Sequence, residues 1–427
     1  MSSAEDVLGA SQPTSPPLPR SRCRLCDAPL QRTFVDLGAQ PSANAYLPAD
    51  RLSAMEPTWP LHAYVCDGCH LVQLEALHSS EELFADYAYF ASYSGSWLRH
   101  AEAYVESMLR RFGADWRGPV VEVASNDGYL LQYFVRAGVP VLGIDPAANI
   151  AAAAEARGVP TLVRFFGRAV ASELAAQGKR ADLVIANNVL AHVPDMHDFV
   201  AGLATIVRPQ GIMTLEFPHL LRLIEECQFD TIYHEHFSYL SLGVVERLFS
   251  EHGLAVFDVE ELSTHGGSLR IFAARREGAP APSDRLAALR ARELAAGLDE
   301  PATYSAFAER AASIKRKLLR TLMDIRDAGK TVAAYGAPAK GNTLLNYCGI
   351  GTDLVGFTVD RNPHKQGHWL PGSRIPVLQP ERLRDERPDY LLILPWNLKA
   401  EIMQDCAFIR EWGGEFILPI PDVAVVP

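Results

Sequence analysis

Four cysteines near the start of the chain are spaced for metal binding. They form two Cys-x-x-Cys pairs, Cys23/Cys26 and Cys66/Cys69, and account for four of seven cysteines in 427 residues. Thiolates are preferred zinc ligands, and two such pairs supply the four that a tetrahedral ion needs. Disulfides are the alternative, but the rest of the chain has the composition of an intracellular protein, in which thiols stay reduced. We expect one structural zinc ion, with no coordination position left open for catalysis.

A second group of side chains is suited to proton transfer. Tyr233, His234, Glu235 and His236 are consecutive and lie beyond an apolar run that we interpret as the fifth strand, and His192 follows the fourth. Imidazole exchanges protons near neutral pH, and loops at the carboxyl ends of parallel strands line ligand crevices. A second metal at the two histidines of the run is disfavoured because no third ligand is evident. We expect acid–base chemistry here.

The run VVEVASNDGYLL, residues 120–131, indicates a nucleotide-type cofactor. A buried strand ends there in a turn of small or turn-prone residues, which lets backbone N–H groups face a ligand. Asp145 ends the next strand, roughly twenty residues on, where an acid accepts ribose hydroxyls. A nicotinamide cofactor and S-adenosylmethionine both fit this pattern. The expected cofactor-binding residues are Glu122, Ala124, Asn126, Gly128, Asp145 and Asn187.

A third constellation lies in AYGAPAKGNTLLN, residues 334–346. A strand ends at Tyr335, and a turn leads to Lys340 at the start of a helix, which favours a pyrophosphate group. The residues alone fit a second dinucleotide site equally well. The expected substrate-binding residues are Tyr335, Lys340, Asn342, Thr343, Asp360 and Asn397.

The elements that position these residues indicate an α/β protein. Short strand-like runs broken by Pro and Gly surround the cysteines, which predicts a zinc-stapled β-rich module. Five apolar runs separated by helical segments, followed by two more, predict a doubly wound Rossmann-like sheet ending in an antiparallel pair. A second, smaller Rossmann-like series follows. The expected divisions are a disordered tail (1–21), the zinc module (22–80), the central domain with a helical lead-in (81–280), a helical linker (281–330) and the C-terminal domain (331–427).

Composition excludes several classes of partner. The formal net charge is −11, so no basic field is available to hold nucleic acid. The sequence contains no run of eighteen apolar residues, so no membrane span is predicted. The opening residues also lack the apolar core of a signal peptide. We expect a cytoplasmic monomer.

Ten motifs in fixed order resemble one enzyme family, from about Cys23 to near the end of the chain. They are CRLC, QPSANAYL, YVCDGC, YAYFASYSGSW, VVEVASNDGYLL, ANNVLAHVPD, YHEHFSYLS, THGGSLR, AYGAPAKGNTLLN and VDRNP with PGSRIPV. Together they resemble the S-adenosylmethionine-dependent sugar C-methyltransferases that act on nucleotide-linked 4-keto-deoxysugars. In that family the Ala-Ser-Asn-Asp-Gly turn is usual.

The resemblance implies a mechanism residue by residue. His236 would take the proton at C3 of the sugar, Glu235 would orient groups, and Tyr233, Tyr89 and His192 would line the sugar pocket and stabilise the enolate. The implied ligands are S-adenosylmethionine, structural zinc and a 4-keto-deoxysugar carried on a nucleoside diphosphate, with thymidine diphosphate as the expected carrier. Methylation at C5, an O- or N-methyltransferase, and an NAD-dependent nucleotide-sugar epimerase or oxidoreductase are the alternatives.

Overall fold

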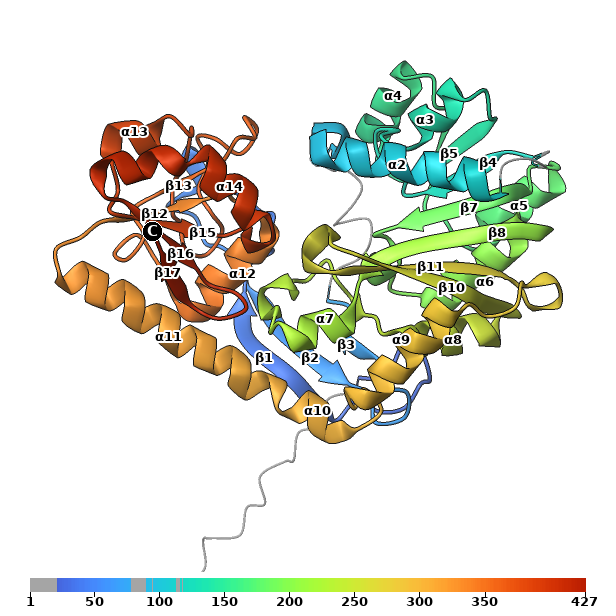
Figure 1. The fold of residues 1–427 in the computed structure, drawn as a ribbon, viewed down its shortest axis with the longest axis horizontal. Coiled ribbons are helices and arrows are strands. Elements are labelled where there is room, and N and C mark those ends of the chain that lie inside the picture. The colour runs from blue at the N-terminus through green and yellow to red at the C-terminus, as the bar shows by residue number, and fades with distance from the viewer. Residues whose placement is uncertain (1–20, 78–89, 94, 113–115, 117) are drawn as a thin grey trace, which may run out of the picture.

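The structure is a computed structural model that describes residues 21–77, 90–93, 95–112, 116 and 118–427. In this part of the chain, three β-sheets and their helices follow one another in sequence, except that the first sheet takes its fourth strand from residues 238–239 (Figure 1). Most of the expected tail and all of Tyr89 lie outside the described residues.

The N-terminal sheet is antiparallel and has the order β1-β2-β3-β9. Its strands are β1 (Arg32–Gln40), β2 (Trp59–Val65), β3 (Val72–Leu74) and β9 (Ser238–Tyr239). The fourth strand belongs to the YHEHFSYLS run, because Val72 pairs with Tyr239 and Gln73 with Ser238. The module around the cysteines therefore extends directly into the catalytic candidates.

The central sheet confirms the expected doubly wound order with an antiparallel end. Its seven strands run β10-β11-β8-β7-β4-β5-β6, and the five from β8 to β6 are parallel. β11 lies antiparallel between β8 and β10, which distinguishes this sheet from a six-stranded parallel one. The strands are β4 (Val120–Val123), β5 (Val141–Asp145), β6 (Thr161–Val163), β7 (Ala181–Asn187), β8 (Val207–Pro218), β10 (Leu254–Leu262) and β11 (Ser268–Arg275).

Helices connect these strands, and hydrogen-bonding caps fix some of their starts. Asp195 and Ser241 accept backbone N–H bonds at the first turns of α6 and α8, which satisfies donors that a helix leaves unpaired. The helices of this region are α2 (Gly95–Phe112), α3 (Leu131–Arg136), α4 (Ala148–Ala156), α5 (Arg168–Ala176), α6 (Met196–Ile206), α7 (Leu220–Glu225) and α8 (Leu242–Glu251).

The C-terminal sheet has the order β14-β13-β12-β15-β16-β17, parallel except for its last strand. This confirms a smaller Rossmann-like domain, with its switch in strand order between β12 and β15. Its elements are β12 (Val332–Tyr335), α12 (Ala339–Cys348), β13 (Thr358–Val359), β14 (Val377–Leu378), α13 (Arg382–Glu386), β15 (Tyr390–Ile393), α14 (Lys399–Asp405), β16 (Glu415–Leu418) and β17 (Ala424–Val426).

The bridging region forms α9 (Asp284–Ala295), α10 (Pro301–Ser305) and α11 (Phe307–Asp327). The buried side chains of α11 recur every three or four residues, which gives the helix one apolar face: Phe307, Ala311, Ile314, Leu318, Leu322 and Ile325. The helix runs along β1 and α12 (Figure 1). The ring of Phe307 stacks on Phe34 with centroids 4.3 Å apart. The helix therefore acts as a packed brace between two sheets.

The three sheets do not have three separate cores. One apolar cluster joins the N-terminal sheet to α11, α12 and the C-terminal sheet, with Phe34, Leu61 and Leu345 among its members. Another joins the four cysteines to the central sheet. Short 3₁₀ turns complete the fold: η1 (Ala49–Arg51), η2 (Ala91–Tyr93), η4 (Leu190–His192), η5 (Phe229–Thr231), η6 (Thr264–Gly266), η7 (Arg276–Gly278), η8 (Trp396–Leu398) and η9 (Ala407–Trp412). Among the described residues, no helix combines the length and apolarity that crossing a membrane requires.

Candidate active site and zinc centre

The two Cys-x-x-Cys pairs form matching turns. The residue after each second cysteine adopts a left-handed backbone, with φ of 59° at Asp27 and 61° at His70. Its N–H donates to the carbonyl of the first cysteine, Cys23 or Cys66, at 2.8 Å in both turns. The repeated geometry presents both thiols of a pair on one side of the turn, as a shared metal ion requires.

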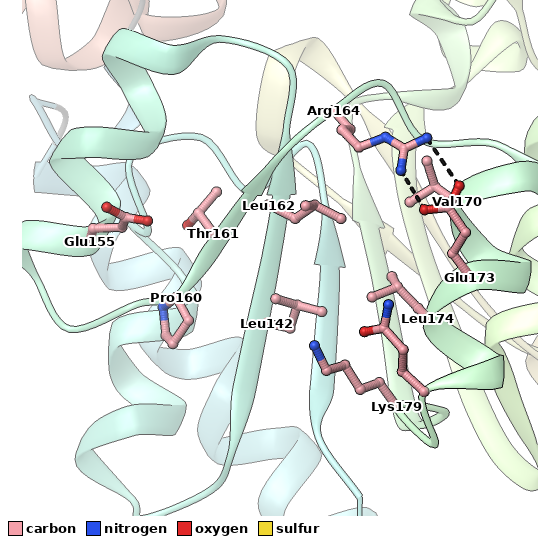
Figure 2. Close-up of a pocket in the computed structure, with 11 residues that line it drawn as sticks. Leu142, Glu155, Pro160, Thr161, Leu162, Arg164, Val170, Glu173, Leu174 and Lys179 are labelled. Atoms are coloured by element: carbon pink, nitrogen blue, oxygen red, sulfur yellow. Dashed lines mark hydrogen bonds and ion pairs between the residues drawn. The ribbon is translucent and has the colours of Figure 1, made fainter.

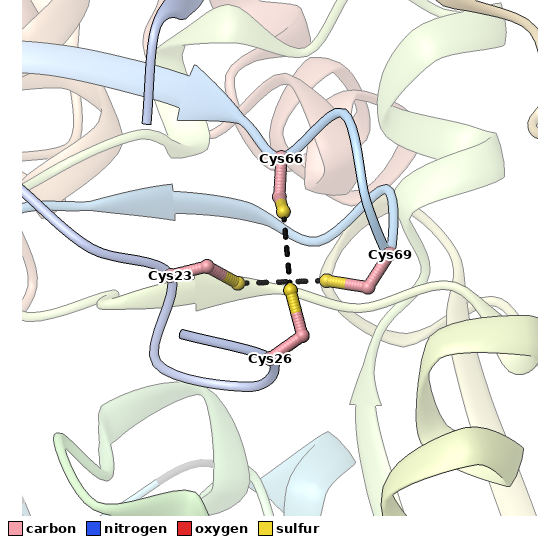
Figure 3. A group of neighbouring side chains, drawn as sticks. All are labelled: Cys23, Cys26, Cys66 and Cys69. Carbon is pink, nitrogen blue, oxygen red and sulfur yellow. Dashed lines mark hydrogen bonds between the residues drawn. The ribbon is translucent and has the colours of Figure 1, made fainter. Parts of the chain in front are cut away.

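The four sulfurs come together at a spacing suited to zinc (Figure 3). Cys23 Sγ lies 3.5 Å from Cys69 Sγ, and Cys26 Sγ lies 3.4 Å from Cys66 Sγ, with all four sulfurs within 4.8 Å of one another. A tetrahedral ion with Zn–S bonds of about 2.3 Å separates its sulfurs by roughly 3.8 Å. The Gln73 side chain donates to Cys23 Sγ at 3.1 Å, which would stabilise a bound thiolate. The donor set fits zinc.

The zinc turns are docked on the central domain. His197 in α6 donates through Nε2 to the carbonyl of Leu25 at 2.8 Å, and Arg247 in α8 donates to the carbonyl of Gly68 at 3.0 Å. Each turn therefore holds one helix of the neighbouring sheet, so loss of the metal would disturb more than the N-terminal module.

At the carboxyl end of β4, the chain makes the tight turn that the sequence predicts. Ala124, Asn126 and Gly128 all have positive φ, at 56°, 49° and 74°. At Gly128 a Cβ atom would lie 3.1 Å from the Val159 side chain, so both conformation and space favour glycine. Asp145 accepts N–H bonds from Asn126 and Ala147 at 3.0 Å each, which ties the turn to the end of β5.

A buried carboxylate beside this turn has no partner. Glu122 is fully buried, and neither of its side-chain oxygens accepts a hydrogen bond from the described residues. Burial, reinforced by Asp145 and Asp127, raises its pKa well above the ordinary value. Asn187 at the end of β7 likewise leaves Oδ1 without a partner. Such orphaned acceptors at one sheet edge suit a positively charged ligand with hydrogen-bond donors.

His236 is held as a neutral imidazole. Its Nδ1–H donates to the carbonyl of Thr231 at 3.0 Å, so Nε2 carries the lone pair and accepts from the Tyr233 hydroxyl at 2.8 Å. Burial, followed by the neighbouring His192, lowers the pKa of His236 well below its ordinary value. The ring therefore stays uncharged and basic at neutral pH.

His192 and Glu235 complete the group. His192 donates through Nδ1 to the Glu235 carbonyl at 2.7 Å, and its ring centroid lies 4.7 Å from that of His236. Burial lowers the pKa of His192 to about 4. The buried Glu235 carboxylate accepts from the Asn44 side chain at 2.7 Å, and burial raises its pKa.

His234 points elsewhere, because its Nε2 bonds to the carbonyl of Trp59 in β2 at 3.3 Å. Among the described residues, the only cluster of three or more His, Cys, Asp or Glu side chains with metal-binding geometry is the cysteine one.

The C-terminal domain contributes a lysine to the same region. Lys340 Nζ donates to Asn397 Oδ1 at 2.9 Å and lies 4.5 Å from the ring centroid of Trp396. Asn342 and Thr343 are buried and donate to the carbonyls of Ala43, at 2.6 Å, and Ile232, at 3.0 Å. These two bonds tie α12 to the zinc module and to the loop before His236.

Asp360 and Tyr335, two of the expected substrate-binding residues, make their contacts within the C-terminal domain. Asp360 accepts the N–H groups of Ala337 at 2.7 Å and Asn362 at 2.8 Å. Tyr335 packs into a separate apolar cluster of the C-terminal sheet. Of the expected substrate residues, Lys340 and Asn397 are the pair that the fold joins by a direct side-chain hydrogen bond.

Sequence reasoning missed Asn44 and Asp230. Asp230 is fully buried, its Oδ2 accepts from Trp396 Nε1 at 2.6 Å, and burial raises its pKa to about 6. Asn44 lies within QPSANAYL and Asp230 lies just before YHEHFSYLS, but only their contacts with distant parts of the chain distinguish them from ordinary loop residues.

A separate surface groove of about 290 Å³ lies on the outer edge of the central sheet, between β6 and α5 (Figure 2). Leu142, Leu162 and Leu174 line it, and Arg164 pairs with Glu173 at its rim at 2.5 Å. None of the candidate residues lines this groove.

Comparisons with known proteins cover nearly the whole chain. Three family models match in order: "Putative zinc binding domain" at residues 23–84, "Methyltransferase domain" at 97–259 and "C-methyltransferase C-terminal domain" at 263–421. The C-methyltransferase NovU of Streptomyces niveus is 38% identical over 413 residues, which cover 96% of this chain and 97% of that protein.

Two further matches cover only part of this chain. A ubiquinone biosynthesis O-methyltransferase of Methylobacterium sp. (strain 4-46) is 38% identical over 122 residues, 26% of this chain and 48% of that protein. The magnesium protoporphyrin IX methyltransferase ChlM of Synechocystis PCC 6803, solved with bound SAM, covers 42% of this chain and 79% of its own, with a TM-score of 0.32 and 16% identity.

The zinc centre yields a direct prediction. Replacing Cys66 by Ser should lower the zinc content from about one ion per chain towards zero, because three thiolates hold zinc less tightly than four. Thermal unfolding should begin at a lower temperature and include the central domain. Cys406→Ala, which removes a buried cysteine outside the cluster, is the matched control and should keep its zinc. Elemental analysis and calorimetry measure both effects; full zinc content in the Ser variant would contradict the site.

Proposed function

The chain belongs to the C-methyltransferase family, and from that premise we propose that it methylates C3 of a 4-keto-deoxysugar carried on a nucleoside diphosphate. S-adenosylmethionine, when bound, supplies an electrophilic methyl group. The observation that carries the proposal is the neutral His236 ring, whose lone pair on Nε2 faces the Tyr233 hydroxyl. A ketone beside the reacting carbon acidifies its C–H bond, so an uncharged imidazole is a base of suitable strength.

The proton step assigns a role to each residue of the cluster. The C–H proton passes to His236 Nε2, and the electron pair moves through the carbon–carbon bond to the ketone oxygen. The Tyr233 hydroxyl must leave Nε2 to admit the substrate, and it then becomes available to donate to that oxygen. Thr231 keeps the proton on Nδ1 and thereby fixes which nitrogen is basic.

His192 and Glu235 position the sugar. The bond from His192 to the Glu235 carbonyl fixes the imidazole beside His236. Asn44 fixes the Glu235 carboxylate as an acceptor for sugar hydroxyls. Holding the reactants in the correct geometry contributes much of the rate enhancement in enzymes that join two substrates.

The cofactor contacts follow from buried side-chain oxygens that have no hydrogen-bond partner among the described residues. Glu122 and Asn187 offer unpartnered oxygens to the charged end of the cofactor, and Asp145 offers a carboxylate to the ribose. The turn of residues 124–128 brings backbone close to the ligand. The C-terminal domain holds the nucleotide part of the sugar donor.

Replacing His236 by Asn should abolish most deprotonation. We expect exchange of the C3 hydrogen with deuterium oxide, measured by NMR on a nucleotide-linked 4-keto-6-deoxyhexose with S-adenosylhomocysteine bound, to fall at least about a hundredfold. His234→Asn, in the same run but bonded to Trp59, should keep the wild-type rate. Exchange at C5 alone would replace C3 methylation by the C5 alternative, and unchanged exchange in His236→Asn would remove the base assignment.

The pH dependence of kcat/KM tests the protonation state. Because the pKa of His236 is lowered, the neutral, active form should persist from pH 8 to about 6.5, and the rate should fall only at lower pH as the ring gains a proton. Steady-state methyl transfer across this range measures the acid limb. An acid limb centred above pH 7 would show that another group is the base.

Glu122→Gln tests the cofactor contact. A charge-assisted hydrogen bond contributes about 1.5–3 kcal/mol, so the Kd of S-adenosylmethionine should rise roughly tenfold to a hundredfold. Glu173→Gln, which alters an exposed carboxylate at the surface groove, is the control and should bind normally in titration calorimetry. Equal affinity in both variants would place the cofactor elsewhere.

A further inference from the structure

Lys340 is held by its neighbours rather than left to extend into solvent. Its Nζ donates to Asn397 Oδ1 and lies over the Trp396 ring, so both the direction and the position of the ammonium are fixed. Burial lowers the pKa of Lys340, while the nearby Asp230 carboxylate acts in the opposite direction. An ammonium kept in place inside a protein interacts more strongly with nearby charge than one in water.

The same bonds connect this lysine to the catalytic base. Trp396 donates to Asp230 at 2.6 Å, and Thr343 in α12 donates to the Ile232 carbonyl at 3.0 Å. The residue between these two anchors, Thr231, accepts the Nδ1–H of His236. Residues 230–232 therefore bind the C-terminal domain through Asp230 and Ile232, and they bind the His236 imidazole through Thr231.

Charge in this region favours a partner with a single negative charge. Asp230 is buried, leaves Oδ1 without a hydrogen-bond partner and is the carboxylate that acts on Lys340. Its negative charge would repel a doubly charged diphosphate more strongly than a singly charged group. Burial is the main cause that lowers the pKa values of His236 and His265, and the Lys340 ammonium adds to the lowering.

We propose that Lys340 stabilises the negative charge that develops on the ketone oxygen when His236 removes the neighbouring proton, and that it is not the clamp for the pyrophosphate. The proton goes to His236 Nε2, the C–H electron pair becomes the carbon–carbon double bond of the enolate, and the carbonyl electrons move to oxygen beside the ammonium. A preorganised cation at the site of developing charge lowers the barrier without reorganisation. The inference rests on the proposed deprotonation of a keto sugar.

The test separates enolate formation from nucleotide binding. Deuterium exchange at saturating keto-sugar nucleotide, with S-adenosylhomocysteine bound, measures enolate formation without methyl transfer. Titration with thymidine diphosphate measures the affinity of the enzyme for the nucleotide. In Lys340→Met, we expect the exchange rate to fall roughly a hundredfold, with the Kd for thymidine diphosphate changed less than about threefold.

Two further variants act as controls. Lys330→Met removes an exposed lysine of the same domain, paired with Asp389, and should leave both measurements unchanged. Asn397→Leu keeps the ammonium but removes its acceptor, so exchange should fall by a smaller factor. If Lys340→Met does not fold, the graded loss in Asn397→Leu carries the test.

The opposite results overturn the proposal. A large rise in the Kd for thymidine diphosphate with exchange preserved at saturation would make Lys340 a pyrophosphate clamp. Unchanged exchange in Asn397→Leu would show that the position of the ammonium does not matter. Absence of exchange in the wild-type enzyme would instead remove the deprotonation step, and with it the proposed function.

Discussion

The hydrogen bond from Nδ1 of His236 to the Thr231 carbonyl is the constraint on which the rest of the site depends. A carbonyl can only accept, so this bond fixes the tautomer and makes Nε2 the basic atom. The carbonyl itself is held because Asp230 and Ile232, on either side, accept bonds from Trp396 and Thr343 of the C-terminal domain. The segment that orients His236 is therefore held in place by the C-terminal domain.

The N-terminal module takes part in the same arrangement. β9, which continues directly from the catalytic run, is the fourth strand of its sheet, and Asn44 reaches the Glu235 carboxylate. The zinc turns also hold α6 and α8 through the carbonyls of Leu25 and Gly68. The cysteine cluster therefore belongs to a module that contacts both the central domain and the run containing His236.

Burial of charge has two different uses in this molecule. Around His192 and His236, burial disfavours the charged imidazoles and so preserves a neutral base. Around Glu122, it leaves a carboxylate without a partner at the place where a cationic cofactor is expected. The group of His192 and His236 thus stays neutral, and Glu122 lacks a cationic partner. Such a site is suited to bind a cation at Glu122 and to generate an anion near the histidines.

Local pattern was sufficient for the elements and for the backbone conformation within single motifs. The doubled Cys-x-x-Cys spacing predicted the sulfur cluster, the seven apolar runs predicted the central sheet with its antiparallel end, and the turn after β4 was read correctly despite Ala124 and Asn126 in place of glycine. Each of these patterns is recognised from residues that lie a few positions apart in the chain, although folding joins cysteines 46 residues apart. The roles of Asn342, Thr343 and Asp360 could not be predicted that way, because their partners lie in other loops or other domains. Asn44 and Asp230 escaped notice for the same reason: a side chain that acts across 191 or 166 residues of chain leaves no periodic trace, and only folding brings it to its partner.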